Sequence, residues 1–576
     1  MPYKRYLQCL VSGVWLTDTT TITPSTLVFS TPSKDEYLDT RPHFIQGFPI
    51  LKSPPLLEEN KNPDATSKDD ISLESAGGWN GGGEPEKLAM RYRKFNLQAL
   101  LNASAKPVGN AGTTCVKLLK CVEGQFNKAF LLTMSNGCEI IARLPNPNAG
   151  PSFFTTASEV ATRHFLRDQL GIPIPRIYDW SSNASNEIGA EYILEEKATG
   201  QPLGNLWGTV SLSTKFHLVD QILDIEKRLA SITFSKHGCI YYTSDLQSKP
   251  CDYELLETKR NYRSGSAADG NDTLPSFAIG PSASPIFWEK QKARMNLDRG
   301  PWESIAAYAE AIGKNEIQWA ISHARPRMNY HRSTECPETP DDYIALLKDY
   351  MALVPFLVPT TSEQPNRISH PDLHLDNIFV DPETYRITSI IDWQQTAVSP
   401  AFLQCCHPQM LELSASPCPD QQIQEEKMLL EHYYDVTKTN DSIRRQLLDD
   451  PLHKLKIDPI SLVPRCWDRE DLFTLRNFLI KIVARWAELK YEQESLPVDF
   501  GEEELLRHED EMDLLEGISG IVHQLQDAGL IPLGGMVRPE YYERAMEANE
   551  RFKQEFIGLA ENESQRDFHA KVWPYN

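Results

Sequence analysis

The spacing of apolar residues changes near Pro202, and this change limits the folds that are open to the chain. Before it, short β-like runs surround a single long helical pattern. Beyond it the period is helical almost throughout, as between 471 and 492, where apolar side chains recur every three or four residues. Apolar residues repeat about every two positions in a half-buried strand and about every 3.6 positions in a helix, so the two patterns belong to different secondary-structure elements. We therefore expect a small mixed lobe followed by a larger helical lobe.

The mixed region opens with a helical pattern at 95–101 and three β-like runs, CVKLLKCVEG, NKAFLLTM and EIIARLP. Ser135-Asn136-Gly137 separates the second and third runs, and Asn-Gly between apolar runs is a strong hairpin signal. A helix is predicted from TTASEVATRHFLRDQLG, with Thr156 and Glu159 as a capping box and Gly171 as its end. The apolar run EYILEEKATGQPL predicts a further strand.

Composition divides the chain into three parts. From Thr31 to about Glu86 the chain is rich in Pro, Ser, Asp, Glu and Gly and cannot bury enough apolar surface to fold alone, so residues 1–86 are expected to form a mobile extension. The first 34 residues are hydroxyl-rich and acid-poor like a transit peptide, although an unstructured tail fits equally well. The small lobe is assigned to 87–196 and the large lobe to 197–576. Within the large lobe, about 243–302 reads as a loop-rich insertion.

The overall charge restricts the partners. There are 58 Lys and Arg against 80 Asp and Glu, a net charge of −22, which disfavours nucleic acid and anionic membrane surfaces. The 11 cysteines include no C-x-x-C pair and fit a reducing compartment. No apolar run reaches the ~18 residues of a transmembrane helix. The oligomeric state is not indicated.

The segment SHPDLHLDNIFVD, residues 369–381, is dense in groups that hold protons or metals. If it were one extended strand, His370, Asp372 and His374 would share a face and could bind zinc, as in a metallohydrolase. Alternatively, Asp372 and Asn377 have the five-residue step of a kinase catalytic loop.

The sequence that follows favours the kinase-type interpretation. NIFVD and RITSIID are β-like runs joined by the turn-forming residues 381–384, so a hairpin should return Asp392 beside Asp372. Phosphoryl transfer uses such a set: one Asp at the acceptor hydroxyl, an Asn on magnesium, and a second Asp on the metal. Pro371 fixes its backbone and opposes a flat strand. His370 is then expected to be a structural residue that bonds the loop backbone.

These motifs resemble a known family. HPDLHLDNIFVD followed by IIDW is similar to the H-G-D-x-H-x-x-N and I-D-W motifs of the aminoglycoside phosphotransferase (APH) family. EGQFNKAFLLTMSNGCEIIARLPNPNAGP and TTASEVATRHFLRDQLGIPIPRIYDW are similar to one fungal branch, the altered-inheritance-of-mitochondria protein 9 type. The similarity covers most of 88–410. It implies an α+β, bilobal protein-kinase-like fold, with a small N-terminal antiparallel-sheet lobe carrying one main helix, a large mostly helical C-terminal lobe, and ATP between them.

The resemblance also assigns roles to residues. Asp372 matches the catalytic base, and Asn377 and Asp392 match the Mg²⁺ ligands. The residues implied at the nucleotide are Arg143 at the α- and β-phosphates, Glu159 as the helix acid that orients it, Gly124 and Asn127 at the phosphate-covering loop, and Leu194, Glu195, Glu196 and Lys197 as the hinge at adenine. Glu159 could equally be only the capping-box residue.

Four positions depart from the usual pattern. Arg143 stands where kinases have lysine, and the two side chains are not interchangeable. Gly124 is the one glycine of the phosphate-covering loop, Pro371 stands where relatives often have glycine, and Gln394 follows IDW where many relatives have Glu.

The expected function is transfer of the γ-phosphate of ATP, with Mg²⁺, to a hydroxyl of a small molecule that the sequence does not identify. The alternatives are a catalytically weak or inactive kinase-like scaffold in mitochondria, and a metallohydrolase. The expected location is the mitochondrion, with the cytoplasm as the alternative.

Overall fold

The chain folds as two compact units. One comprises Pro85–Arg327 and Pro337–Gly501, and the described part of the other lies chiefly in 502–573. The first 86 residues, predicted to be a mobile extension, lie outside the described residues. The computed structural model describes residues 91–108, 112–121, 126–256, 276–329, 336–359, 364–404, 406–414, 420–489, 495–527, 542–558, 560 and 562–573.

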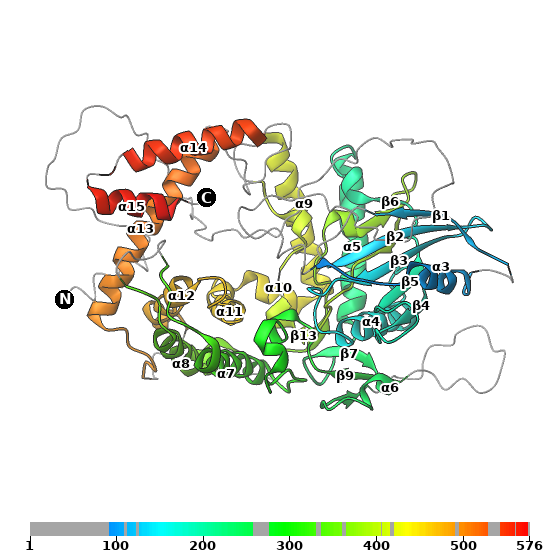
Figure 1. Ribbon diagram of the computed structural model, residues 1–576, viewed down its shortest axis with the longest axis horizontal. Helices are drawn as coiled ribbons and strands as arrows, with labels where there is room; N and C mark the ends of the chain where they lie inside the picture. Colours follow the sequence, from blue (N-terminus) through cyan, green and yellow to red (C-terminus); the bar gives the residue numbers. More distant parts are fainter. Residues whose placement is uncertain are drawn as a thin grey trace. The chain divides into compact units, whose positions relative to one another are not determined.

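A five-stranded sheet forms the first lobe of the larger unit (Figure 1). The strand order is β1-β2-β3-β5-β4, and all neighbouring pairs are antiparallel. The four predicted β-like runs are confirmed as β1, β2, β3 and β5. Strand β4 was missed, because Pro173 and Pro175 before it resemble a connection. The bounds are β1 Cys115–Lys120, β2 Asn127–Met134, β3 Glu139–Pro145, β4 Ile177–Ser181 and β5 Tyr192–Glu196.

The predicted hairpin between β2 and β3 is confirmed. Gly137 has φ +83°, the left-handed conformation that glycine adopts without cost, and its N–H donates to the carbonyl of Met134 at 2.8 Å. Helix α3, Leu97–Ala105, packs Leu100 against the apolar side chains of this sheet. The side chain of Asn96 caps α3 by accepting the N–H of Ala99 at 3.1 Å.

The main helix of the small lobe is α4, Phe154–Leu170, and it ends at Gly171 as predicted. The predicted capping box is wrong, because the helix begins before Thr156 and its N-cap is Phe153. The carboxylate of Glu191 accepts the Phe153 N–H at 3.0 Å and the Thr156 hydroxyl at 2.7 Å. Glu191, which is distant in sequence, therefore stabilises the first turn of α4. The carboxylate of Glu159 is not needed for capping and can bind another partner.

The connection between the lobes leads directly into the sheet of the Asp372 loop. After β5, residues 197–200 reach β6, Gln201–Pro202, which pairs with β11, Ile378–Val380. Strand β11 forms a hairpin with β12, Ile387–Ile390, as predicted from NIFVD and RITSIID.

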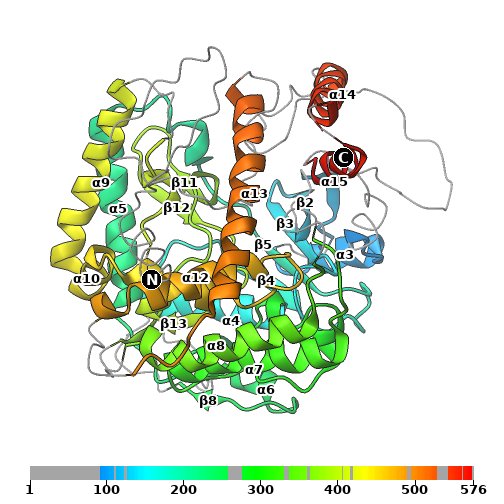
Figure 2. The same cartoon turned by 90° about the vertical axis from the view of Figure 1, so that its left-hand side faces the viewer.

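The second lobe of this unit is mostly helical. Helices α5 and α9 pack side by side, as do α7 and α8 (Figure 2). The helix predicted at 471–492 is shorter than expected, because α12 ends at Ala484 and a 3₁₀ turn, Trp486–Leu489, follows. The helices are α5 Leu212–Ala230, α6 Thr243–Leu246, α7 Ile305–His323, α8 Pro340–Leu357, α9 Asp420–Asn440, α10 Ser442–Asp449, α11 His453–Leu462 and α12 Leu472–Ala484.

Small sheets join this lobe to α4. Strand β9, within the stretch predicted to be loop-rich, places Phe277 against Phe165 of α4, with ring centroids 5.4 Å apart. Residues 257–275 of that stretch lie outside the described residues. The strands are β7 Cys239–Tyr242, β8 Glu254–Leu255 and β9 Phe277–Gly280 in one sheet, and β10 Asn366–Ile368 with β13 Val398–Pro400 in another. Short 3₁₀ turns are Leu203–Asn205, Pro285–Phe287, Lys290–Arg294, Leu375–Asn377, Ala401–Gln404 and Gln409–Leu411.

The described part of the second unit contains three helices, α13 Glu502–Asp527, α14 Tyr542–Gly558 and α15 Glu563–Val572. Helix α13 confirms the helix predicted from the sequence at 503–527. The rings of Phe556 and His569 stack with centroids 4.2 Å apart, joining α14 to α15. Across both units, no helix within the described ranges is long and apolar enough to cross a membrane.

Gly200, in the connection between the lobes, provides a test of this packing. Its φ is +90°, and an added Cβ would lie 2.3 Å from the Val380 carbonyl oxygen. We expect Gly200→Ala to lower the free energy of unfolding by about 3 kcal/mol in urea titration, because a left-handed backbone and overpacking each have a cost. Gly208→Ala is the control, since its Cβ would meet nothing within 4 Å. Equal losses in the two variants would contradict this packing.

Candidate active site

The loop between β10 and β11 carries Asp372 and Asn377 and is fixed by its own hydrogen bonds. The Asn377 side-chain nitrogen donates to the backbone carbonyl of Asp372 at 3.0 Å. The Ile391 N–H donates to the Asn377 carbonyl at 3.0 Å, which ties the loop to the end of β12. The Asn377 side chain therefore uses its nitrogen within the loop, while its oxygen is left for a cation. The Asp372 side chain is 67% exposed.

His370 is a structural residue, as predicted. Its Nε2 lies 2.9 Å from the Ile391 carbonyl, and its Nδ1 accepts the Asp372 N–H at 3.1 Å. Nε2 must therefore carry the proton and donate to Ile391. Burial lowers the pKa of His370 to about 4, although the bond to Ile391 opposes the shift. Both ring nitrogens are occupied by backbone, so His370 is unavailable as the zinc ligand of the metallohydrolase alternative.

Asp392 follows β12 and lies beside the loop. Its φ is +63°, an uncommon backbone conformation for a residue with a side chain. Solvent reaches the carboxylate, but protein surrounds it on most sides, so burial raises its pKa. Arg143 lowers the pKa of Asp392 and Asp372 raises it further, so both groups are within electrostatic reach.

The pair Asp392 and Asn377 suits Mg²⁺ by its chemistry. Mg²⁺ takes oxygen ligands, is held by one or two carboxylates, and leaves other positions to water and phosphate. Among the residues that the structure describes, no three His, Cys, Asp or Glu side chains gather as a metal site built only from such ligands would need. The donor set therefore fits a cation shared with a phosphate-bearing substrate.

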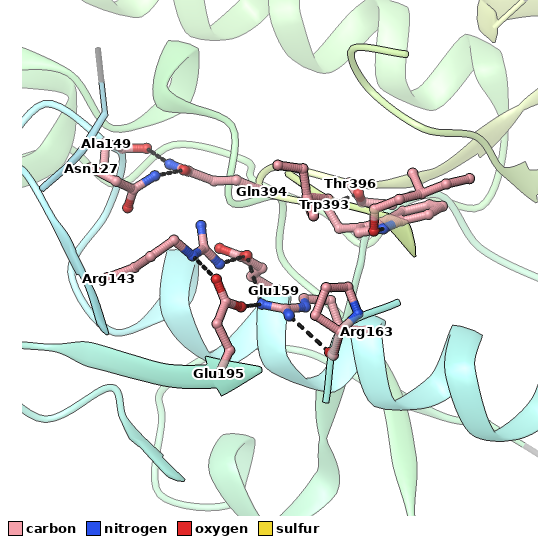
Figure 3. A network of polar contacts seen from close by, with 12 residues as sticks. Asn127, Arg143, Ala149, Glu159, Arg163, Glu195, Trp393, Gln394 and Thr396 are labelled. Carbon is pink, nitrogen blue, oxygen red and sulfur yellow. Dashed lines mark hydrogen bonds and ion pairs between the residues drawn. The ribbon is translucent and has the colours of Figure 1, made fainter. Parts of the chain in front are cut away.

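Arg143 on β3 is held by two carboxylates (Figure 3). Its Nη2 pairs with Glu159 of α4, and its Nε donates to Glu195 of β5 at 2.9 Å. Burial alone would lower the pKa of Arg143, but Glu159, Glu195 and Asp392 together raise it well above its ordinary value. The guanidinium therefore stays charged within electrostatic reach of Asp392.

Arg163 completes what we call the arginine–glutamate cluster: Arg143, Glu159, Arg163 and Glu195. Its Nη1 lies 3.5 Å from Glu159 Oε1 and also pairs with Glu195 Oε2. Burial raises the pKa of Glu195, but the two arginines outweigh it and the net shift is downward. Sequence reasoning missed Arg163, although Glu159 and Arg163 have the four-residue spacing of a helical ion pair.

The side chains of the other residues expected at the nucleotide have different surroundings. Leu194 is buried in the core of the small lobe. Glu196 accepts the Arg176 N–H at 3.1 Å, and Lys197 pairs with Glu139 at 2.7 Å on the surface. Gly124, expected in the phosphate-covering loop, lies outside the described residues.

Asn127 bonds to the opposite lobe. Its Nδ2 donates to Gln394 Oε1 at 2.6 Å, and Gln394 Nε2 donates to the Ala149 carbonyl at 3.1 Å (Figure 3). Gln394, noted only as a departure from the usual motif, thus joins the Asp392 segment to the sheet lobe.

Comparisons with known proteins agree with these motifs. The model of the phosphotransferase enzyme family (APH) matches residues 118–403. A subtelomeric hrmA-associated cluster protein of Aspergillus fumigatus is 29% identical over 515 residues, which cover 80% of this chain and 97% of its own length. Altered inheritance of mitochondria protein 9 of Yarrowia lipolytica is 23% identical over 498 residues, 78% of this chain and 81% of its own.

Solved structures were also matched. The streptomycin-ATP-APH(2")-IIa ternary complex has 12% identity and a TM-score of 0.36, and covers 68% of this chain and 99% of its own. A macrolide 2'-phosphotransferase type I has 10% identity and a TM-score of 0.31, with coverages of 67% and 99%.

Residues 118–403 thus match the model of the phosphotransferase enzyme family. The expected α+β, protein-kinase-like fold is confirmed, with its antiparallel sheet lobe and mostly helical second lobe. Its relatives include the fungal altered-inheritance-of-mitochondria protein 9 group, as the sequence motifs indicated.

His370 should make stability depend on pH. Its pKa is about 4 in the folded chain and about 6.5 when unfolded, so its contribution is complete above about pH 6.5 and is lost as the pH falls toward 4. We expect His370→Gln to lack this dependence. The difference in unfolding free energy between wild type and variant should shrink by about 1–2 kcal/mol from pH 7 to pH 5 in urea titrations. A difference that does not change with pH would contradict a neutral, bonded imidazole.

Proposed function

We propose that this protein is an ATP- and Mg²⁺-dependent phosphotransferase that transfers the γ-phosphate of ATP to a hydroxyl group of a small molecule. The observation that carries the proposal is the return of β12 beside the Asp372 loop, with Asp392 in electrostatic reach of Asp372 and Arg143. Phosphoryl transfer depends mainly on positioning and charge stabilisation, which this arrangement suits. The family match supports the same class of reaction.

Each residue has a role in this proposal. Asp372 aligns the acceptor hydroxyl and accepts its proton. Asn377 and Asp392 hold Mg²⁺, which neutralises charge on the triphosphate when bound. Arg143 binds phosphate through Nη1, because Glu159 and Glu195 engage its Nη2 and Nε, and Glu159 keeps the guanidinium in place. Backbone groups of 194–197 are assigned to the adenine base.

A second candidate is a nucleotide-binding scaffold with little or no turnover. It is favoured by the arginine–glutamate cluster, because Glu159 and Glu195 already engage two of the three nitrogens of Arg143. A guanidinium held in this way has less freedom to follow the phosphate during transfer than a flexible lysine has.

Asp372→Asn tests the proposed base. We expect this variant to lose at least about 100-fold in ADP formation in the presence of an acceptor, since proton transfer by a positioned base contributes roughly that much or more. Binding of ATP and Mg²⁺ should be retained. The measurement is ATP consumption with fractionated small-molecule pools, followed by binding titration of both proteins.

Two outcomes separate the candidates. Undiminished turnover in Asp372→Asn would rule out the assigned base. Metal-dependent ATP binding by wild type, with no phosphorylated product from any pool, would favour the scaffold.

We also propose that the protein resides in mitochondria. Curated relatives carry mitochondrial names, and the first 34 residues contain one acid, Asp18, among many Ser and Thr. A fluorescent fusion of the full chain should colocalise with a mitochondrial dye, and deletion of residues 1–34 should abolish colocalisation. Cytoplasmic fluorescence from the full-chain fusion would contradict this location.

A further inference from the structure

Gln394 is buried between the lobes, and both ends of its amide are used by the small lobe. Its Oε1 accepts from Asn127 at 2.6 Å and its Nε2 donates to Ala149 at 3.1 Å. Only 7% of the residue is exposed. A buried amide with both ends satisfied by the opposite lobe is a specific contact, because shifting either lobe would leave a polar group without a partner.

The segment that carries Gln394 has a specific backbone conformation that its surroundings hold. Asp392 and Gln395 have φ of +63° and +62°, so two residues in left-handed conformations flank Trp393 and Gln394. The Trp393 side chain is fully buried, and its Nε1 donates to the Ile390 carbonyl at 3.0 Å. Strained backbone persists only where the surroundings fix it. The positions of Asp392 and Gln394 are therefore coupled through one fixed turn.

The two contact points in the small lobe also belong to one fixed piece. Asn127 is the first residue of β2, and Ala149 lies between β3 and α4. The Ala149 N–H donates to the Asn146 carbonyl at 3.0 Å, and the Asn146 N–H donates to the Phe126 carbonyl at 2.8 Å. Residue 129 of β2 pairs with Arg143 of β3, so this piece continues directly into the strand that carries Arg143.

We propose that Gln394 and Asn127 are positioning residues that set the separation between Arg143 and Asp392, and so select for the triphosphate–metal part of the nucleotide. The inference rests on the proposed function, since it concerns the same candidate site.

The lobes are joined covalently through 197–200 and pack together through α4, as in the contact of Phe165 with Phe277. The amide contact is a further attachment, and it lies beside Asp392. Without it, the β2–β3 part of the sheet, which carries Arg143, can shift relative to Asp392, and the two charged groups are no longer held at one distance along a phosphate chain.

The test compares two ligands in isothermal titration with the full chain. We expect Gln394→Ala to weaken binding of MgATP by about tenfold, which corresponds to about 1.4 kcal/mol, and to change binding of adenosine by less than about twofold. Asn127→Ala should act in the same direction, and the double variant should lose no more than the stronger single variant, because both changes remove one contact. Asn127 is partly exposed, so this variant keeps the test valid if Gln394→Ala folds poorly.

Gln404→Ala is the matched control. The Gln404 side-chain nitrogen donates to the Arg367 carbonyl at 2.9 Å, so this hydrogen bond stays within the helical lobe. This variant should leave the affinities for MgATP and adenosine unchanged.

The outcomes distinguish the inference from the function on which it rests. Equal weakening for MgATP and adenosine, or unchanged MgATP affinity in both variants, would overturn the positioning role while the phosphotransferase proposal stands. A wild-type protein that binds no MgATP would overturn both. Additive losses in the double variant would show that Asn127 and Gln394 act separately, which also contradicts the inference.

Discussion

The arrangement of the small lobe depends on neutralising buried charge. Arg143 and Arg163 carry two positive charges, and Glu159 and Glu195 carry two negative charges, in a region where none of the four side chains is more than 12% exposed. Removing any one member would leave a buried charge without its partner. The free-energy cost of that unpaired charge is much larger than the net stabilisation that an intact buried ion pair provides. The cluster joins β3, α4 and β5, so the sheet, its helix and the start of the connection between the lobes are held in one relation.

In the proposed function Arg143 takes the position that kinases give to lysine, and the cluster explains how arginine can do so. A guanidinium presents several donors in a fixed plane and can contact Glu159 and Glu195 at once, whereas an ammonium group is a compact point charge. The second glutamate and second arginine are therefore best understood together with Arg143. The presence of arginine at position 143 therefore depends on Glu195 and Arg163 as well as on Glu159.

Much of the fold was predictable because its signals are local. Asn136-Gly137 marks a hairpin through backbone conformation, Gly171 ends a helix for the same reason, and the apolar spacing of 503–527 identifies a helix. The predictions that were wrong also have physical reasons. The start of α4 depends on Glu191, which is far away in sequence, and the short strand β4 follows two prolines that resemble a connection. The length of α12 was overestimated because apolar spacing continues into a 3₁₀ turn.

The sequence by itself determined the chemical groups and their order: an Asp and an Asn five residues apart, a hairpin that returns a second Asp, and a structural His370. These follow from turn chemistry and strand length, which act over a few residues. Only the tertiary structure decided that Arg163 and Glu195 join Arg143, and that Gln394 and Asn127 connect the lobes. Those contacts join residues up to 267 positions apart. Which charged or polar groups become partners depends on which of them are buried together, and this is set only when the chain packs.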